Sequence, residues 1–92
     1  MFETLKIYTD KSISLTSASA SLASLGYCRT DETAEVGDFS VLGDVLEIFP
    51  VNFKYPVRVE LEYDTVKKIY SFDKVLNLKV QSYDLLIVID HQ

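Results

Sequence analysis

Charged and apolar side chains alternate strictly over residues 57–63, in the order Val57, Arg58, Val59, Glu60, Leu61, Glu62 and Tyr63. Successive side chains of a strand point to opposite faces of its sheet. The alternation therefore predicts a strand whose apolar side chains, including Tyr63, face a core, while Arg58, Glu60 and Glu62 face outward. Residues 5–9 alternate over a shorter length and predict another strand.

The segment from residue 14 to residue 25 has the spacing of a helix. Its apolar side chains follow the first at intervals of three, seven and ten residues, at Leu15, Ala18, Leu22 and Leu25. This interval places them on one face of a helix. Ser14 is a suitable N-cap residue, and Gly26 stands where a glycine commonly follows a helix. We therefore expect one helix of small residues, about 14–25, packed closely on a sheet.

Further strands are predicted by short apolar segments between turn residues. Residues 27–30 fit one strand, and residues 39–49 fit strand structure that Gly43-Asp44 interrupts with either a turn or a bulge. Residues 66–72 fit a strand that returns from 57–63 after a short connection at Asp64-Thr65.

The end of the chain predicts a loop over residues 73–77 and a last strand, buried on both faces, over residues 83–89. Together the segments indicate an α+β fold of two layers. The sheet is mostly antiparallel, with five to seven short strands, and the helix packs on one face. We expect residues 1–92 to form a single domain.

Charge and composition exclude several classes of protein. The net charge is −5, from 9 basic and 14 acidic residues, whereas nucleic-acid binding depends mainly on Lys and Arg neutralising phosphates. We therefore expect no direct nucleic-acid contact by this domain. No apolar run approaches the roughly 20 residues of a membrane span. The single cysteine fits a reducing compartment, so we expect a cytoplasmic protein without membrane contact.

Residues able to perform catalysis or bind metal are scarce. His91 lies one residue from the end, where we expect a solvated tail, and Cys28 opens a predicted strand, where we expect a buried structural thiol. One His and one Cys cannot form a zinc site without carboxylates. The chain has three glycines and no phosphate-binding loop motif. We therefore expect no ATPase or other enzymatic activity, no metal and no cofactor.

Four motifs occur in a fixed order along the chain. They are Leu25-Gly26-Tyr27-Cys28-Arg29, the glycine-flanked segment 37–50, Pro56-Val57-Arg58-Val59-Glu60, and Ser71-Phe72-Asp73. With the last apolar strand, this order and spacing resemble the UvrA-interacting domain shared by the excision-repair protein UvrB and the transcription-repair coupling factor. The residues around Phe39 and Pro56 are slightly more similar to the coupling factor.

The resemblance implies a module that docks on UvrA in nucleotide excision repair or transcription-coupled repair, and that forms part of a larger ATP-dependent DNA translocase or helicase. It also implies partner-binding roles for Arg29, Arg58 and Glu60. Similar proteins carry arginine where this chain has Leu42, and often also where it has Ser40. The loss of these arginines bears directly on how strongly UvrA would be bound.

Two other interpretations stay open. The domain could be a structural module of its parent chain that packs against other domains of that chain and has reduced or lost UvrA binding. It could instead contact DNA, which the acidic charge opposes. Without the resemblance, Arg58 and Glu60 would be read as a solvated strand face that pairs with Lys67 or Lys68, worth about 0–1 kcal/mol per pair. In either case we expect Arg58→Ala to change folding stability little.

Overall fold

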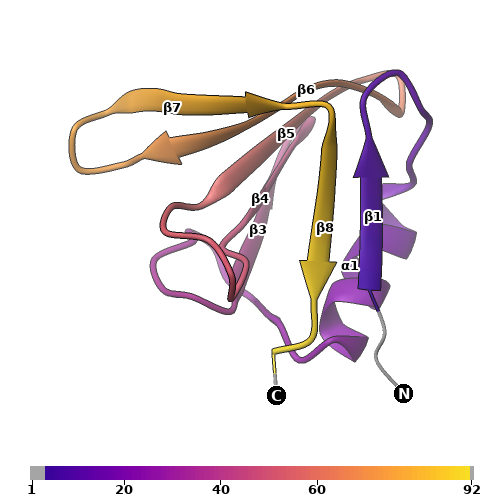
Figure 1. The fold of residues 1–92 in the computed structure, drawn as a ribbon. Helices are drawn as coiled ribbons and strands as arrows, with labels where there is room; N and C mark the ends of the chain where they lie inside the picture. Colours follow the sequence, from indigo (N-terminus) through magenta and orange to yellow (C-terminus); the bar gives the residue numbers. More distant parts are fainter. Residues whose placement is uncertain (1–3, 92) are drawn as a thin grey trace.

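The computed structural model describes residues 4–91 of the chain (Figure 1). Its elements, in order, are β1 (Thr4–Tyr8), α1 (Leu15–Ser24), β2 (Cys28–Arg29), β3 (Asp38–Leu42), β4 (Val45–Ile48), β5 (Val57–Glu62), β6 (Thr65–Asp73), β7 (Leu78–Tyr83) and β8 (Leu85–Ile89). Strands β2 to β7 form a six-stranded sheet in chain order, and β1 pairs with β8 as a separate two-stranded ribbon. Only the β2–β3 pair is parallel among the strands described. The α+β class is confirmed.

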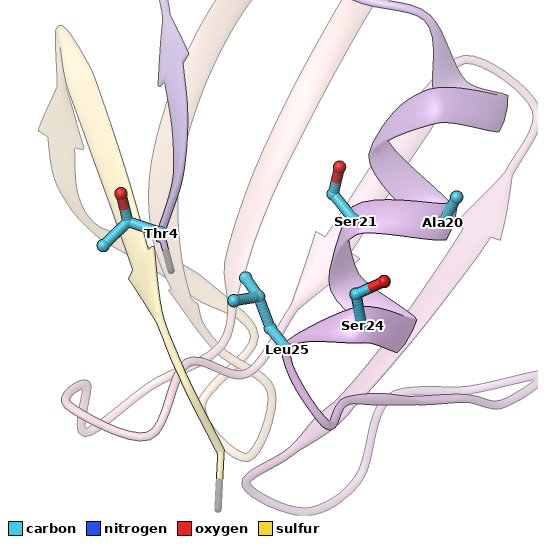
Figure 2. A pocket seen from close by; sticks show the side chains of 5 residues that line it. All are labelled: Thr4, Ala20, Ser21, Ser24 and Leu25. Atoms are coloured by element: carbon cyan, nitrogen blue, oxygen red, sulfur yellow. The ribbon is translucent and has the colours of Figure 1, made fainter. Parts of the chain in front are cut away.

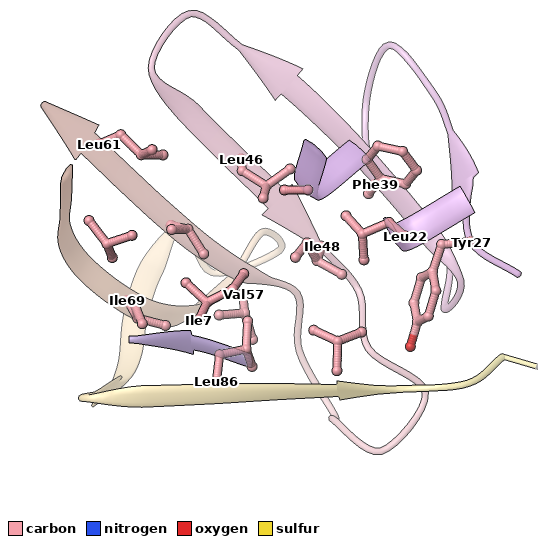
Figure 3. Close-up of a cluster of buried hydrophobic side chains, with 14 of the residues drawn as sticks. Ile7, Leu22, Tyr27, Phe39, Leu46, Ile48, Val57, Leu61, Ile69 and Leu86 are labelled. Carbon is pink, nitrogen blue, oxygen red and sulfur yellow. The ribbon is translucent and has the colours of Figure 1, made fainter. Parts of the chain in front are cut away.

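The core lies between the inner face of the six-stranded sheet and a second layer made of α1 and the β1–β8 ribbon (Figures 1 and 3). The sheet contributes buried side chains that include Phe39, Leu46, Ile48, Val57, Val59 and Ile69. The second layer contributes Ile7, Ala18, Leu22, Leu25, Leu86 and Val88. One face of the sheet is thus committed to the core, and the opposite face, called the outer face below, is left for other contacts.

Helix α1 confirms the expectation for residues 14–25. The Ser14 side chain accepts a hydrogen bond from the backbone N–H of Ser17 at 3.2 Å, as an N-cap does. Gly26 follows the helix with a φ of 92°, a left-handed conformation that glycine adopts without strain. No helix within residues 4–91 has the length and apolar character needed to cross a membrane.

Two tight turns set the register of the sheet. Gly43-Asp44 forms a turn between β3 and β4, which decides between the turn and the bulge. The β5–β6 turn comprises Tyr63 and Asp64, both with positive φ (50° and 66°), so it lies one residue earlier than the predicted Asp64-Thr65. The predicted inward position of Tyr63 is therefore wrong: its side chain is 94% exposed at the turn.

The C-terminal strands differ from the prediction in burial. Strand β7 forms the edge of the large sheet and is exposed along nearly its whole length. No strand is predicted there from the sequence, although Leu78 and Val80 alternate with Lys79 and Gln81. Strand β8 is half-buried rather than fully buried, since Leu86 and Val88 face the core while Leu85, Ile87 and Ile89 do not. The reason is its partner: β8 pairs only with β1, and one face of that ribbon is uncovered.

The β5–β6 turn generates a first prediction. Both central residues occupy the left-handed region, which glycine adopts without strain and which Asp adopts only at some cost. We expect Asp64→Gly to raise the free energy of unfolding by about 0.5–1 kcal/mol, measured by urea denaturation. Gly43→Ala is the matched control, because Gly43 has a φ of 60° in open space and should lose a similar amount. A loss of stability in Asp64→Gly would show that the aspartate side chain matters more than its backbone conformation.

Candidate functional site

Two rows of side chains cross strands β3 to β6 on the outer face. Directly paired residues of neighbouring strands point to the same side of a sheet. The strand register gives one row as Ser40, Glu47, Arg58 and Tyr70. The next row is Leu42, Val45, Glu60 and Lys68. The outer face therefore brings together four of the five residues that the sequence singled out.

A buried carboxylate lies at the centre of this face. Glu47 is only 5% exposed, and each of its carboxylate oxygens meets one cation. Arg58 Nε donates to Oε2 at 2.7 Å, and Lys74 Nζ donates to Oε1 at 2.9 Å. A charge removed from water is strongly destabilising unless it is paired and hydrogen-bonded. The two cations meet that requirement and tie β4 to β5 and to the turn after β6.

Ser40 is buried beside Glu47 and does not face solvent. Its hydroxyl is hydrogen-bonded to that of Thr33 at 2.9 Å, and Thr33 Oγ1 also donates to the backbone oxygen of Glu47 at 3.3 Å. Lys74 Nζ donates to the backbone oxygen of Thr33 at 2.7 Å. The connection between β2 and β3 therefore covers this part of the outer face, and in this conformation it shields Ser40 from any partner.

Arg58 is fixed in position and charged. Its guanidinium carbon lies 3.8 Å from the centroid of the Phe72 ring, a stacked cation–π contact. Partial burial alone would lower the pKa of Arg58, but the hydrogen bond and charge of Glu47, with a smaller effect of Tyr70, outweigh it and raise the pKa. The bond to Glu47 uses one of five guanidinium N–H groups. The other end of the fork is left for further contacts.

Glu60 is held by a neighbour in the sheet. The Tyr70 hydroxyl donates a hydrogen bond to Glu60 Oε2, and Lys79 Nζ lies 5.0 Å from the centroid of the Tyr70 ring. Burial raises the pKa of Tyr70, and the hydrogen bond and charge of Glu60 raise it further. Glu60 Oε1 takes no part in this hydrogen bond and can accept another. The expected pairing with Lys68 is not formed, although Lys68 is the register partner of Glu60.

An open depression of ≈ 280 Å³ lies between the two rows, lined by Leu42, Val45, Glu47, Arg58, Glu60 and Tyr70. Leu42 forms its apolar side and is 61% exposed. Arg58 and Glu60 form its charged side. Opposite charges next to an exposed aliphatic side chain are suited to binding a protein surface rather than to bond-breaking chemistry.

Arg29 lies apart from this cluster. Strand β2 is separated from β5 by β3 and β4, which amounts to about 14 Å at the usual strand spacing. Arg29 pairs with Phe39, a core residue, so it points to the inner side of the sheet at its exposed edge. The structure therefore does not bring Arg29 together with Arg58.

A second hollow, of ≈ 460 Å³, lies between α1 and the start of β1 (Figure 2). Its lining consists of Thr4, Ala20, Ser21, Ser24 and Leu25. These side chains include hydroxyl groups but no charged or nucleophilic thiol or imidazole group. The hollow therefore offers weaker recognition chemistry than the outer face.

The candidates for chemistry take structural or exposed positions. Cys28 is exposed, so the expected buried thiol is wrong, because its side of β2 faces away from the core. His91 is exposed but packs on the fold: its ring lies 5.7 Å from the ring of Tyr27, and its backbone N–H donates to the backbone oxygen of Leu25 at 2.8 Å. Within residues 4–91, no three His, Cys, Asp or Glu side chains are grouped to hold a metal ion.

Sequence reasoning missed three members of the cluster, Glu47, Lys74 and Thr33. A signal existed for Glu47, which stands between Leu46 and Ile48 in a strand that is otherwise apolar. A lone carboxylate in such a strand requires a cation nearby. Lys74 and Thr33 lie in connections without periodicity, so only the folded chain shows that they meet there.

Comparisons with known proteins agree with the motif order. A family model described as the UvrB interaction domain matches residues 5–91. UvrABC system protein B of Methanosphaera stadtmanae is 34% identical over 85 residues, which cover 92% of this chain and 13% of that protein. The same protein of Fervidobacterium nodosum is 32% identical over 89 residues (95% and 14%). The transcription-repair-coupling factor of Borreliella burgdorferi is 30% identical over 74 residues (80% and 7%). The chain thus spans only a small part of these relatives.

The ion-pair cluster reverses the expectation about stability. We expect Arg58→Ala to lower the free energy of unfolding by about 1–3 kcal/mol, because buried Glu47 keeps only Lys74 as a cationic partner. Urea denaturation measures this loss. Adding Glu47→Gln should make the loss caused by Arg58→Ala smaller. Arg29→Ala is the control and should stay within about 0.5 kcal/mol. Equal losses from Arg58→Ala with and without Glu47→Gln would contradict the coupling.

The Tyr70 hydroxyl makes stability sensitive to alkaline pH. Its pKa is raised in the fold, so its contribution is complete below the ordinary tyrosine pKa of about 10 and is lost as pH rises through the raised value. We expect the unfolding free energy of the wild type to fall above pH 10 more steeply than that of Tyr70→Phe. Tyr8→Phe is the control, because Tyr8 is exposed and has no hydrogen bond to Glu60. Parallel curves for wild type and Tyr70→Phe would contradict this assignment.

Proposed function

The chain belongs to the UvrB interaction domain family, and from this membership we propose that it is a docking module whose partner is UvrA. Its setting would be nucleotide excision repair or transcription-coupled repair, the processes that the names of its relatives indicate. The docking surface is the outer face of the sheet, with Arg58 as its anchor.

The observation that carries this proposal is the way Arg58 is held. Glu47 binds its Nε, Phe72 covers one face of the guanidinium, and the side chain remains 29% exposed. A guanidinium held in this way loses little conformational freedom when it binds a carboxylate of the partner. Glu60, fixed by Tyr70, offers an acceptor to a basic group of the same partner.

The remaining positions named by the resemblance, Leu42, Ser40 and Arg29, differ in how accessible they are to a partner on this surface. Leu42 lies on it and is exposed, so a partner there meets an aliphatic side chain instead of an arginine. Ser40 belongs to the same row as Arg58 but lies beneath the connection between β2 and β3, so it makes no direct contact with a partner. Arg29 points to the inner side of the sheet, so it contributes only if the partner extends around the edge formed by β2.

We place the module within a longer chain, an ATP-dependent DNA translocase or helicase of the cytoplasm, because its relatives extend far beyond the matched region. A second candidate function is a structural module of that chain with reduced UvrA binding. The observation that favours it is the loss of arginine at Leu42 together with the burial of Ser40. Binding measurements separate the two.

Titration of the cognate UvrA tests the proposal. Arg58→Lys is the sharpest variant, because a lysine keeps a cation beside Glu47 but lacks the planar fork. We expect it to weaken binding about tenfold or more, with the unfolding free energy close to that of the wild type. Glu60→Gln should weaken binding less, and Leu42→Arg should strengthen it by restoring the family's charge.

Lys6→Ala is the matched control and should bind like the wild type, because Lys6 is exposed and pairs with Ile87 on the uncovered face of the β1–β8 ribbon. Wild-type binding that Arg58→Lys leaves unchanged would place the docking surface elsewhere. Absence of binding by the wild type, with none gained in Leu42→Arg, would favour the structural module.

A further inference from the structure

We propose that the exposed turn between β6 and β7 is the apolar anchor of the docking surface, inserting Val75 and Leu76 into an apolar pocket of the same partner that binds Arg58. This inference rests on the proposed function, because the partner is the protein that contacts Arg58. It adds to that function a second contact of different chemistry on a different element.

The turn presents apolar side chains to solvent without any cover from this chain. Val75 is 93% exposed and Leu76 is 66% exposed, and Leu78 at the start of β7 is half exposed. Single exposed aliphatic residues are ordinary, but neighbouring ones at the tip of a projecting hairpin form a patch of the kind that marks an interaction site. Figure 1 shows the β6–β7 hairpin reaching away from the core.

The turn is also held in one conformation. Asp73 Oδ1 accepts hydrogen bonds from the backbone N–H groups of Val75 at 2.9 Å and Leu76 at 3.0 Å. Asn77 ends the turn with a φ of 57°, which asparagine adopts more readily than most residues. Because the turn is already ordered, binding costs little conformational entropy, and the free energy of its apolar contacts contributes more fully to the affinity.

One side chain joins the turn to the charged cluster. Lys74, which immediately precedes Val75, donates to Glu47 Oε1 at 2.9 Å and to Thr33 O at 2.7 Å. Glu47 in turn binds Arg58, and Arg58 stacks on Phe72 at the end of β6. Through these contacts Val75 and Leu76 have a fixed position relative to the guanidinium of Arg58.

The chemistry of the partner follows from this arrangement. It must offer a carboxylate to Arg58 and, beyond Phe72, a pocket lined by apolar side chains that accepts two aliphatic groups. Burying an aliphatic side chain in an apolar pocket is favourable, by roughly 25 cal/mol per Å² of apolar surface removed from water. The two contacts differ in their response to salt, because screening weakens charge interactions but not apolar burial.

The experiment measures binding of the cognate UvrA to the full chain and to three variants. These are the double variant Val75→Ser with Leu76→Ser, the single variant Arg58→Lys, and the control Ile87→Ser. Ile87 is 38% exposed on the uncovered face of the β1–β8 ribbon, away from the outer face. Each titration is made at about 0.05 M and about 0.5 M salt, which changes the screening length severalfold. A fourth variant, Leu76→Lys, is measured in addition to these three as a second variant of the turn. Thermal unfolding of each variant reports whether the fold is retained.

We expect the double variant to raise the Kd about tenfold or more, by the same factor at both salt concentrations. The factor for Arg58→Lys should shrink at high salt, and Ile87→Ser should bind like the wild type. If the wild type binds and Arg58→Lys weakens binding, but the turn variants do not, the turn is not an anchor and the proposed function stands. If the factor by which the turn variants raise the Kd also shrinks at high salt, as for Arg58→Lys, the turn acts indirectly through the charged cluster, and the apolar contact is contradicted. No binding by the wild type would overturn both proposals.

Discussion

The buried carboxylate of Glu47 is the constraint on which the outer half of this structure depends. A charge in that position is unfavourable without cations, and the two that serve it come from different elements, Arg58 on β5 and Lys74 after β6. The same network reaches Thr33 and so holds the β2–β3 connection over the sheet. One ionised side chain therefore determines where two connections lie, although neither contributes to the apolar core.

The same constraint shapes the surface that a partner would meet. Arg58 serves the fold through its Nε and remains available through the rest of its fork. A residue with both roles cannot be replaced freely, because Ala at position 58 weakens the fold as well as any interface. On a strand with one solvated face, inward side chains usually determine stability and outward ones are free to determine binding. Arg58 points outward and yet contributes to both. Substitutions that retain the cation are for this reason the informative ones.

The sequence predicted those parts of the fold in which apolar spacing and burial coincide. Helix α1 and strand β5 followed from periodicity because each has one face in the core. Strand β7 was missed, because its alternation covers only Leu78 to Gln81 and neither Leu78 nor Val80 is buried. Arg58 and Glu60 were recognised as outward-facing, but the partner of Arg58 lies eleven residues away on another strand, and Lys74 lies in a loop. Long-range pairing of a buried charge leaves no local signal apart from the lone Glu47 itself.

Residue 40 is one of the two positions at which the resemblance implies an arginine. Position 40 is the register partner of Glu47, so an arginine there would lie directly opposite the carboxylate and would supply a cation from β3. Serine is too short to do so, and in this chain Lys74 supplies the second cation from the β6–β7 turn, with Ser40 and Thr33 filling the space beside it. These contacts cover the surface over β3 and hold the turn that carries Val75 and Leu76. For the proposed docking function, the side chains left accessible to a partner would then be Arg58, Leu42 and those of the β6–β7 turn.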